Sequence, residues 1–280
     1  MDKHRKGKKN SGSEARLKRF KKILWGGLAA GIVLAVLLFF LIEKGVFGEL
    51  PTFEDIENPE SSVATEIISA DGETIGKIWK NENRSPVKFE ELSPYLVDAL
   101  IATEDERFRK HSGIDVRSTV RAVVFLGRRG GASTLTQQLA KQLFTKNASQ
   151  NKIERIIQKF QEWIIAAQLE RSYTKDEIIT MYFNTYDFLY NAYGIKNASL
   201  TYFNKLPSEL TIEEAATLVG MAKNPILYNP IRIPENSLAR RNTVLGQMKR
   251  TGMLTDQPCD CLRALPPPPA LPIPTPTPST

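Results

Sequence analysis

Glu104 is the residue whose type and position best suit acid–base chemistry. Ser93-Pro94 predicts a helix start, because a serine cap and a proline in the first turn are both favoured there. Glu104 follows Leu100 and precedes Phe108 by one turn each, a position where packing favours an apolar side chain. We expect desolvation there to disfavour the charged form of its carboxyl group, as in a general base. The alternative is that the helix ends near Thr103 and Glu104 is a solvated loop residue.

A second group of polar side chains recurs every three or four residues along a helix predicted for residues 134–145. Together these side chains offer hydroxyl, amide and ammonium donors, which suit sugar hydroxyls and phosphate oxygens. The alternative is a capping box that only opens an ordinary amphipathic helix. The four residues are Thr134, Gln137, Gln138 and Lys141.

A third group lies on the polar face of a long helix predicted for residues 152–171. Two cations and a carboxylate along one face can bind a pyrophosphate, either directly or through a divalent metal held by the acid. The alternative is a solvated face with ordinary helix-stabilising ion pairs. The residues are Arg155, Gln158, Lys159 and Glu162.

The elements that position these groups are mostly helical. The stretches Val63–Ile68 and Thr74–Trp79 predict two strands of a β-hairpin, with Asp71-Gly72 suited to the turn. After Arg84 the apolar spacing is helical, so we predict a mainly α domain. The helices are predicted at 94–110, 115–126, 134–145, 152–171, 175–184, 211–222 and 235–250.

The positive charge of the chain is confined to its start. The formal net charge is +7, but residues 1–22 alone carry a net charge of +8, so the remainder is about neutral and predicts no nucleic-acid partner. Ile23–Ile42 is an uncharged apolar stretch of the length that a membrane-spanning helix needs. We expect a retained anchor with its basic flank in the cytoplasm and the rest of the chain outside. A cleaved signal peptide is the alternative, but the apolar stretch is long for one.

The other segments outside the helical region offer little for a core. Residues 43–62 read as a spacer, and residues 256–280 as a Pro-rich disordered tail or linker that buries nothing. Cys259 and Cys261 are too close for a relaxed disulfide, and two ligands do not make a zinc site.

Five ordered segments within about residues 63–255 resemble the motifs of the peptidoglycan glycosyltransferase family. This family occurs as monofunctional transglycosylases and as the first catalytic domain of class A penicillin-binding proteins. A complete bifunctional relative would continue into a transpeptidase domain, and we expect this chain to be either monofunctional or a part of such a protein. The matching segments are Glu104–Gly113, Gly131–Gln138, Lys159–Glu162, Tyr182–Ile195 and Gly220–Pro230, followed by a helix with Arg240-Arg241.

The resemblance implies a mainly α, lysozyme-like glycosyltransferase domain with a small N-terminal β-hairpin and one N-terminal transmembrane helix. It implies that the protein polymerises lipid II into glycan strands at the cytoplasmic membrane, with moenomycin as an inhibitor and other cell-wall synthesis proteins as partners. Glu104 would be the catalytic base, and Glu162 would assist catalysis and bind a divalent metal, Mg or Mn. The residues implied in binding sugar or pyrophosphate are Asp105, Ser133, Thr134, Gln137, Gln138, Lys141, Arg155 and Lys159.

Two departures from the family pattern accompany this resemblance. The third motif usually has an arginine where this chain has Gln158, and Arg155, one turn earlier on the same face, is expected to replace its charge. The fourth motif usually has a Gly-rich stretch where this chain has residues 187–191. Two other functions stay open, a membrane-anchored lysozyme-like hydrolase with water as acceptor and an inactive cell-wall scaffold.

Overall fold

The chain forms two compact units in the computed structural model. The first unit combines Met1–Leu50 with Asn151–Gln161, and the second combines Pro51–Gln150 with Glu162–Thr280. The structure describes residues 11–48, 50–52, 65–68, 74–78, 85–125, 131–144, 150–255 and 261–263.

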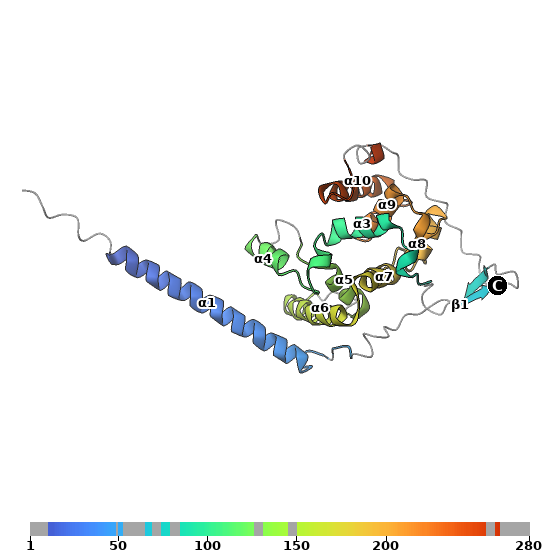
Figure 1. Ribbon diagram of the computed structural model, residues 1–280. Helices are drawn as coiled ribbons and strands as arrows, with labels where there is room; N and C mark the ends of the chain where they lie inside the picture. The colour runs from blue at the N-terminus through green and yellow to red at the C-terminus, as the bar shows by residue number, and fades with distance from the viewer. Residues whose placement is uncertain are drawn as a thin grey trace, which may run out of the picture. The chain divides into compact units, whose positions relative to one another are not determined.

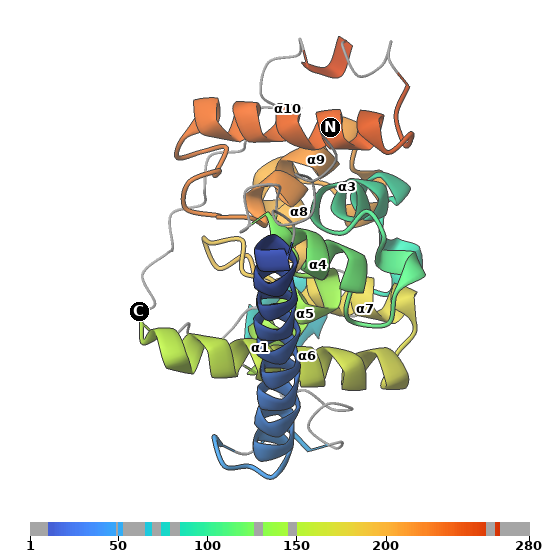
Figure 2. The same cartoon turned by 90° about the vertical axis from the view of Figure 1, so that its left-hand side faces the viewer.

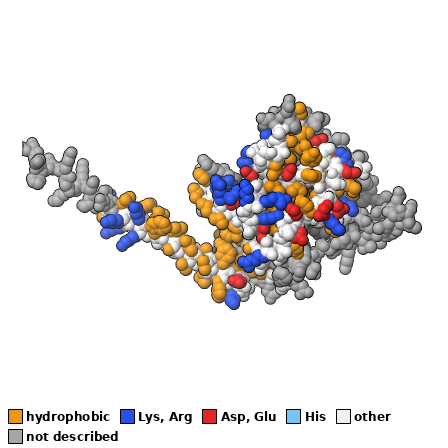
Figure 3. Space-filling view, viewed as in Figure 1, with side chains coloured by type: hydrophobic (Ala, Val, Ile, Leu, Met, Phe, Trp, Pro, Cys, Tyr) orange, Lys and Arg blue, Asp and Glu red, His pale blue; other side chains and the backbone are white. Residues whose placement is uncertain are grey.

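Helix α1 (Ser11–Glu43) dominates the first unit. Within the described part of the chain, it is the helix long and apolar enough to cross a membrane. The helix begins well before the predicted apolar stretch Ile23–Ile42, because lysine and arginine are themselves good helix formers. Figure 3 shows apolar side chains along α1 and basic side chains gathered at its N-terminal end.

The second unit is mainly helical, as predicted (Figures 1 and 2). Short 3-10 turns η1 (Phe89–Glu91), η2 (Phe108–Lys110) and η3 (Pro207–Glu209) connect some of its helices. The helices are α3 (Pro94–Glu104), α4 (Val116–Val124), α5 (Leu135–Phe144), α6 (Lys152–Ser172, which begins in the first unit), α7 (Lys175–Thr185), α8 (Ile195–Phe203), α9 (Ile212–Met221) and α10 (Pro234–Arg250).

Helices α3, α9 and α10 pack on one another and form the core behind the site (Figure 2). Leu100 of α3, Leu218 of α9 and Val244 of α10 are completely buried. Gly220 permits a close approach of α9 and α10, because a Cβ atom there would lie 3.1 Å from Cγ of Arg240. This packing fixes the end of α3 relative to α10.

The predicted helix 94–110 is interrupted after Glu104. Asp105 leaves helical geometry, with φ −155° and ψ 78°. Its carboxylate instead accepts a hydrogen bond from the backbone N–H of Leu135, at 3.0 Å. Since that contact joins positions thirty residues apart, the local apolar pattern does not reveal it.

Helix α8 is absent from the sequence prediction. It follows Gly194, whose φ of 79° favours glycine and whose Cβ, if added, would lie 2.9 Å from the carbonyl oxygen of Asn184. The buried face of α8 includes Asn197 and Ser199, which bond locally to backbone carbonyls. These buried polar residues interrupt the apolar spacing by which a helix is recognised.

Strands β1 (Thr65–Ile68) and β2 (Thr74–Ile78) pair antiparallel, with Thr65 opposite Ile78 and an irregularity between Ile67 and Ile68. The predicted turn between them lies outside the described residues, as do Val63 and Trp79.

Residues 261–263, which lie within the predicted tail, form hydrogen bonds with α10. The buried Arg241 side chain donates a hydrogen bond to the carbonyl oxygen of Leu262 at 3.1 Å. In return, the Arg263 guanidinium donates to the carbonyl oxygen of Asn242. Cys261 is free and exposed, and Cys259 lies outside the described residues.

Candidate active site

A polar cavity of about 720 Å³ opens beside the C-terminal end of α3. Its walls come from the α3 end and the following turn, from α4, from residues 131–134 and from α10. Four arginines and four carboxylates contribute to this lining, so the cavity suits a strongly polar ligand. Arg107 and Arg250 pair with Asp115 and Glu106, and the other two arginines come from α4. The four arginines are Arg107, Arg117, Arg121 and Arg250.

Glu104, the last residue of α3, borders this cavity, and its side chain is 17% exposed. One carboxylate oxygen accepts a hydrogen bond from Nε2 of Gln138 at 3.0 Å. The other lies 3.5 Å from Nη2 of Arg240. The helix does end here, as in the alternative interpretation of the sequence, but the side chain is held by α5 and α10 rather than solvated. Arg240 was noted in the sequence only as part of a helix.

Two tyrosines lie on another side of Glu104. The rings of Tyr182 and Tyr186 stack with centroids 6.0 Å apart, and the Tyr182 hydroxyl donates to Oε1 of Gln138 at 3.4 Å. Burial, and then the negative charge of Glu104, raise the pKa of both phenols above the ordinary value. Both tyrosines therefore stay neutral around Glu104 throughout the physiological pH range.

Asp105 joins the turn after α3 to the start of α5. Its buried carboxylate accepts from the Leu135 N–H at the N-terminus of α5, where a negative charge is favourable. His111 Nε2 lies 2.9 Å from the same carboxylate oxygen. Asp105 lines the cavity, but its oxygens are engaged in holding the turn. His111 thus helps to hold the same turn.

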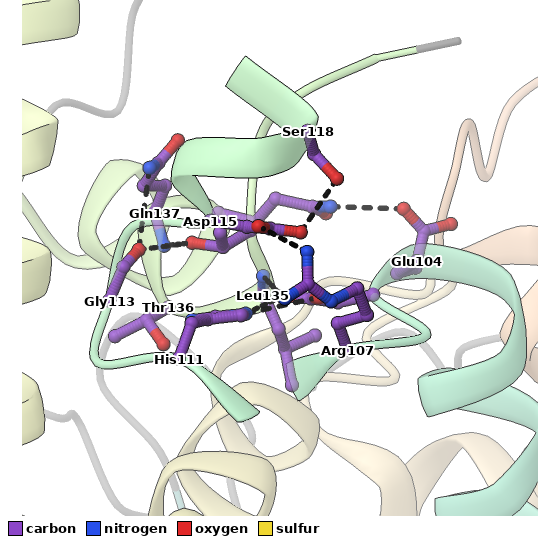
Figure 4. A network of polar contacts seen from close by, with 12 residues as sticks. Glu104, Arg107, His111, Gly113, Asp115, Ser118, Leu135, Thr136 and Gln137 are labelled. Carbon is purple, nitrogen blue, oxygen red and sulfur yellow. Dashed lines mark hydrogen bonds and ion pairs between the residues drawn. The ribbon is translucent and has the colours of Figure 1, made fainter. Parts of the chain in front are cut away.

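Gly113 connects the first and second motifs. Its carbonyl oxygen accepts hydrogen bonds from Oγ1 of Thr134 at 2.6 Å and from Nε2 of Gln137 at 3.3 Å (Figure 4). Thr134 also accepts from the Gln137 N–H, so half of the predicted capping box is present. Both side chains are buried, and the Gln137 amide points at the glycine turn rather than into the cavity.

The other predicted binding residues near the second motif divide into those that line the cavity and one that does not. Ser133, Thr134 and Gln138 line the cavity. Lys141 is exposed on α5 and is outside the set of residues that line it. The structure thus brings Gln138 into contact with Glu104. The contact of Lys141 with a pyrophosphate stays a prediction.

Asp115 anchors the start of α4, which sequence reasoning did not assign to the site. Its buried carboxylate accepts from Oγ of Ser118 at 2.6 Å, from the Arg117 N–H at 3.1 Å and from Nη1 of Arg107 at 3.0 Å (Figure 4). The available signal was an aspartate at the first position of the predicted helix 115–126. Through this anchor, Arg117 and Arg121 of α4 are held in the wall of the cavity.

The third motif spans both units. Glu162 is buried and belongs to the second unit, whereas Arg155, Gln158 and Lys159 belong to the first. The joint action of these residues therefore stays a prediction. Within the described residues, no group of three or more acidic, histidine or cysteine side chains is arranged to hold a metal.

Comparison with known proteins decides the family. A family model described as Transglycosylase matches residues 71–249, more than half of the chain. This chain belongs to the transglycosylase family. The match covers the Glu104 site, its partner Arg240 and the arginines of α4 that line the cavity.

Curated relatives of this transglycosylase are penicillin-binding proteins. The chain is 38% identical over 218 residues to penicillin-binding protein 1A of Neisseria flavescens, covering 76% of this chain and 27% of the relative. It is 35% identical over 243 residues to penicillin-binding protein 1A of Escherichia coli K12, covering 83% of this chain and 28% of the relative. It is 39% identical over 196 residues to penicillin-binding protein 1F of Bacillus subtilis, covering 69% of this chain and 27% of the relative.

The transglycosylase chain thus spans somewhat more than a quarter of the length of these relatives. Among solved structures, penicillin-binding protein 1A from Haemophilus influenzae aligns with a TM-score of 0.43 and 25% identity. That alignment covers 76% of this chain and 22% of the other.

Replacing Asp115 with asparagine is expected to make the stability of this transglycosylase less dependent on acid pH. Burial raises the pKa of Asp115, but hydrogen bonds from Ser118 and the Arg117 N–H and the charge of Arg107 together lower it below its ordinary value. A carboxyl with a depressed folded pKa stabilises the protein above its unfolded pKa, about 3.9, and loses this contribution as the pH falls through the folded value.

Urea unfolding at pH 7 should therefore show a loss of about 1–3 kcal/mol for Asp115→Asn, since an acceptor of charge-assisted hydrogen bonds is weakened. Below pH 4 the free energies of unfolding of wild type and variant should converge. A difference that stays constant down to pH 2 would show that Asp115 does not titrate differently in the folded state.

Proposed function

We propose that this transglycosylase polymerises lipid II into β-1,4-linked glycan strands and releases undecaprenyl pyrophosphate. The observation that carries the proposal is the Glu104 carboxylate, held by Gln138 and Arg240 at the edge of an arginine-lined cavity. A positioned carboxylate serves a transfer to a sugar hydroxyl, and cations serve a leaving group that carries negative charge.

The reaction is a single displacement with inversion at the anomeric carbon. Glu104 takes the proton of the acceptor GlcNAc 4-hydroxyl as its oxygen attacks the anomeric carbon of the donor MurNAc. The bond from that carbon to the pyrophosphate oxygen breaks, and the electron pair leaves with the lipid pyrophosphate. Gln138 and Arg240 keep the carboxylate oriented during the proton transfer, while Arg117 and Arg121 add positive charge to the cavity.

We further propose that Lys141, Lys159 and Arg155 neutralise the leaving pyrophosphate and that Glu162 binds Mg or Mn. Because the described residues supply no cluster of three ligands, the donor set fits a cation held mainly by substrate phosphates and a single carboxylate, as is usual for Mg²⁺. Such a cation would supply charge neutralisation.

The fold and location of the protein are proposed to suit a lipid-linked substrate. A lysozyme-like domain that begins with a β-hairpin would lie outside the cytoplasmic membrane, anchored by α1 with its basic end inside. Three valines follow one face of α4 at spacings of four residues, each more than half exposed, and this face suits the membrane interface. They are Val116, Val120 and Val124. Other cell-wall synthesis proteins are the expected partners.

Wild-type protein incubated with purified lipid II, detergent and a divalent cation tests this function. We expect polymeric glycan on gels, suppressed by moenomycin. Soluble disaccharide released from preformed glycan, with no polymer, would favour the lysozyme-like hydrolase, although an arginine-lined cavity is unnecessary for uncharged glycan. A folded wild type that does neither would favour the scaffold.

The substitution Arg155→Ala is expected to lower polymerisation about tenfold or more, because Gln158 lacks the charge that the family usually has at its position. The rate is measured with lipid II, with Arg171→Ala as a control at the far end of the same helix. Undiminished activity of Arg155→Ala would show that the arginine does not replace the missing charge.

A further inference from the structure

The loop between α7 and α8 contains three successive residues in the left-handed backbone region. Leu189, Tyr190 and Asn191 have φ values of 67°, 53° and 59°. Asparagine tolerates this conformation, but leucine and tyrosine are unfavourable in it because their Cβ atoms crowd the backbone. Turn chemistry would favour glycine at such positions. The requirements of the turn therefore do not explain why leucine and tyrosine occupy these positions.

The root of the loop is rigidly fixed. The backbone pairs as a short antiparallel bridge between Asp187 and Tyr193, and the Phe188 N–H donates to the Ala192 carbonyl oxygen at 3.0 Å. Phe188 is fully buried, and its carbonyl oxygen accepts from the Tyr202 hydroxyl at 2.6 Å. The same hydroxyl accepts from the buried side chain of Asn229 at 2.9 Å.

The tip of this fixed loop presents an aromatic ring to solvent. Tyr190 is 41% exposed, although the loop beneath it is packed and hydrogen-bonded. A partly exposed aromatic side chain at a left-handed backbone position breaks two local rules at once. Such violations concentrate at functional sites.

The loop begins beside the catalytic carboxylate. Tyr186 directly precedes it and stacks on Tyr182, whose hydroxyl donates to Gln138, the hydrogen-bond partner of Glu104. In agreement, burial and then the negative charge of Glu104 raise the pKa of Tyr186. The Tyr186 ring also contacts the Phe188 ring, with centroids 5.1 Å apart. Neither Tyr186 nor the loop lines the arginine-rich cavity. Glu104 thus borders the cavity on one side and the tyrosine-bearing segment on another.

We propose that Tyr190 is a binding platform for a pyranose ring of the growing glycan strand, an inference that rests on the proposed polymerisation of lipid II. A polymerase needs substrate on both sides of its base. The arginine-lined cavity suits the side that carries pyrophosphate, whereas a neutral aromatic face packs against the apolar C–H face of an uncharged sugar. Lipid II has two sugars only, so a ring beyond the reacting pair belongs to the strand.

The substitution Tyr190→Gly separates stability from binding, and Tyr190→Phe is its matched control. Glycine relieves the left-handed backbone, so Tm should rise by about 2–4 °C. Binding of a lipid-free GlcNAc–MurNAc oligosaccharide, measured by saturation-transfer NMR and titration, should weaken about tenfold, within the range of aromatic stacking energies. The glycan strands made from lipid II should also be shorter. Phenylalanine keeps the ring and should leave affinity and strand length within about twofold of wild type.

An unchanged affinity in Tyr190→Gly together with a higher Tm would overturn the proposal, since Tyr190 would then be a strained residue without a role in binding. Equal weakening by phenylalanine would also overturn it, because the hydroxyl rather than the ring face would be responsible. Oligosaccharide binding needs no turnover. A wild type that makes no polymer would therefore refute the proposed function, while the binding data still decide the role of Tyr190.

Discussion

The Glu104→Gln protein is expected to polymerise lipid II about 10³-fold more slowly than wild type, within the range that general-base catalysis contributes. Glutamine has nearly the same shape as glutamate and can still accept a hydrogen bond from Gln138 through its amide oxygen. It cannot take a proton from a sugar hydroxyl at neutral pH. The loss should therefore fall on kcat, with lipid II binding little changed.

The matched control is Glu106→Gln, two residues further along the chain. Glu106 also lines the cavity, but it is more than half exposed and its partner is the equally exposed Arg250, at 3.1 Å. Exposed ion pairs contribute little, so this variant should keep its rate within about twofold. Equal losses in both variants would indicate that cavity charge matters rather than a base at Glu104. Near-normal activity of Glu104→Gln would contradict its assignment as the base.

Replacing Gly113 with alanine is expected to destabilise the protein by about 3–5 kcal/mol, the largest stability effect that we predict. Gly113 has a φ of 82°, unfavourable for any L side chain. In addition, an added Cβ would lie 2.8 Å from the carbonyl oxygen of Ala166, a backbone atom of α6 that cannot turn aside. Any shift that relieves this overlap disturbs the bonds from Thr134 and Gln137 to the Gly113 carbonyl.

Thermal unfolding of Gly113→Ala should show Tm lowered by about 6–20 °C, given 2–4 °C per kcal/mol for a domain of this size. The substitution Gly252→Ala isolates the backbone component, because Gly252 has a similar φ of 77° with nothing within 4 Å of an added Cβ. We expect a loss of about 1 kcal/mol there. Similar losses at the two glycines would mean that the contact with α6 is unimportant.

The sequence predicted the features of this fold and site that depend on neighbouring residues. The mainly helical character is confirmed, and the expected family is confirmed by the transglycosylase match. Glu104 was found because a charge interrupts an apolar helical stripe, and the structure places it at the end of α3. That signal is contained in a short stretch of sequence, from Leu100 to Phe108.

The second motif shows where a helical pattern is ambiguous. Gln137 and Gln138 were assigned together to one polar face, yet successive residues of a helix point about 100° apart. In the structure, Gln137 turns towards Gly113, whereas Gln138 turns towards Glu104. Their roles as substrate ligands remain predictions, and the geometry favours Gln138 for a direct part in the site.

Contacts between residues that are not neighbours in the sequence could not be predicted from it. Asp115 binds Arg107 across a turn, and Arg240 reaches Glu104 from α10. Asn184, which belongs to the fourth motif, pairs its amide with both backbone groups of Val87, at 3.0 and 2.9 Å. None of these pairings follows from local periodicity, since each depends on how the helices pack.

The contact between Glu104 and Arg240 joins positions 136 residues apart in the chain. During translation, the carboxylate and its α5 partner Gln138 emerge from the ribosome long before α10 is made. Domains fold only once their long-range partners are available, and such non-local contacts form late. The transglycosylase therefore acquires its complete site only after α10 has been synthesised, so we expect a nascent chain, or a product truncated before that helix, to lack the proposed polymerisation activity.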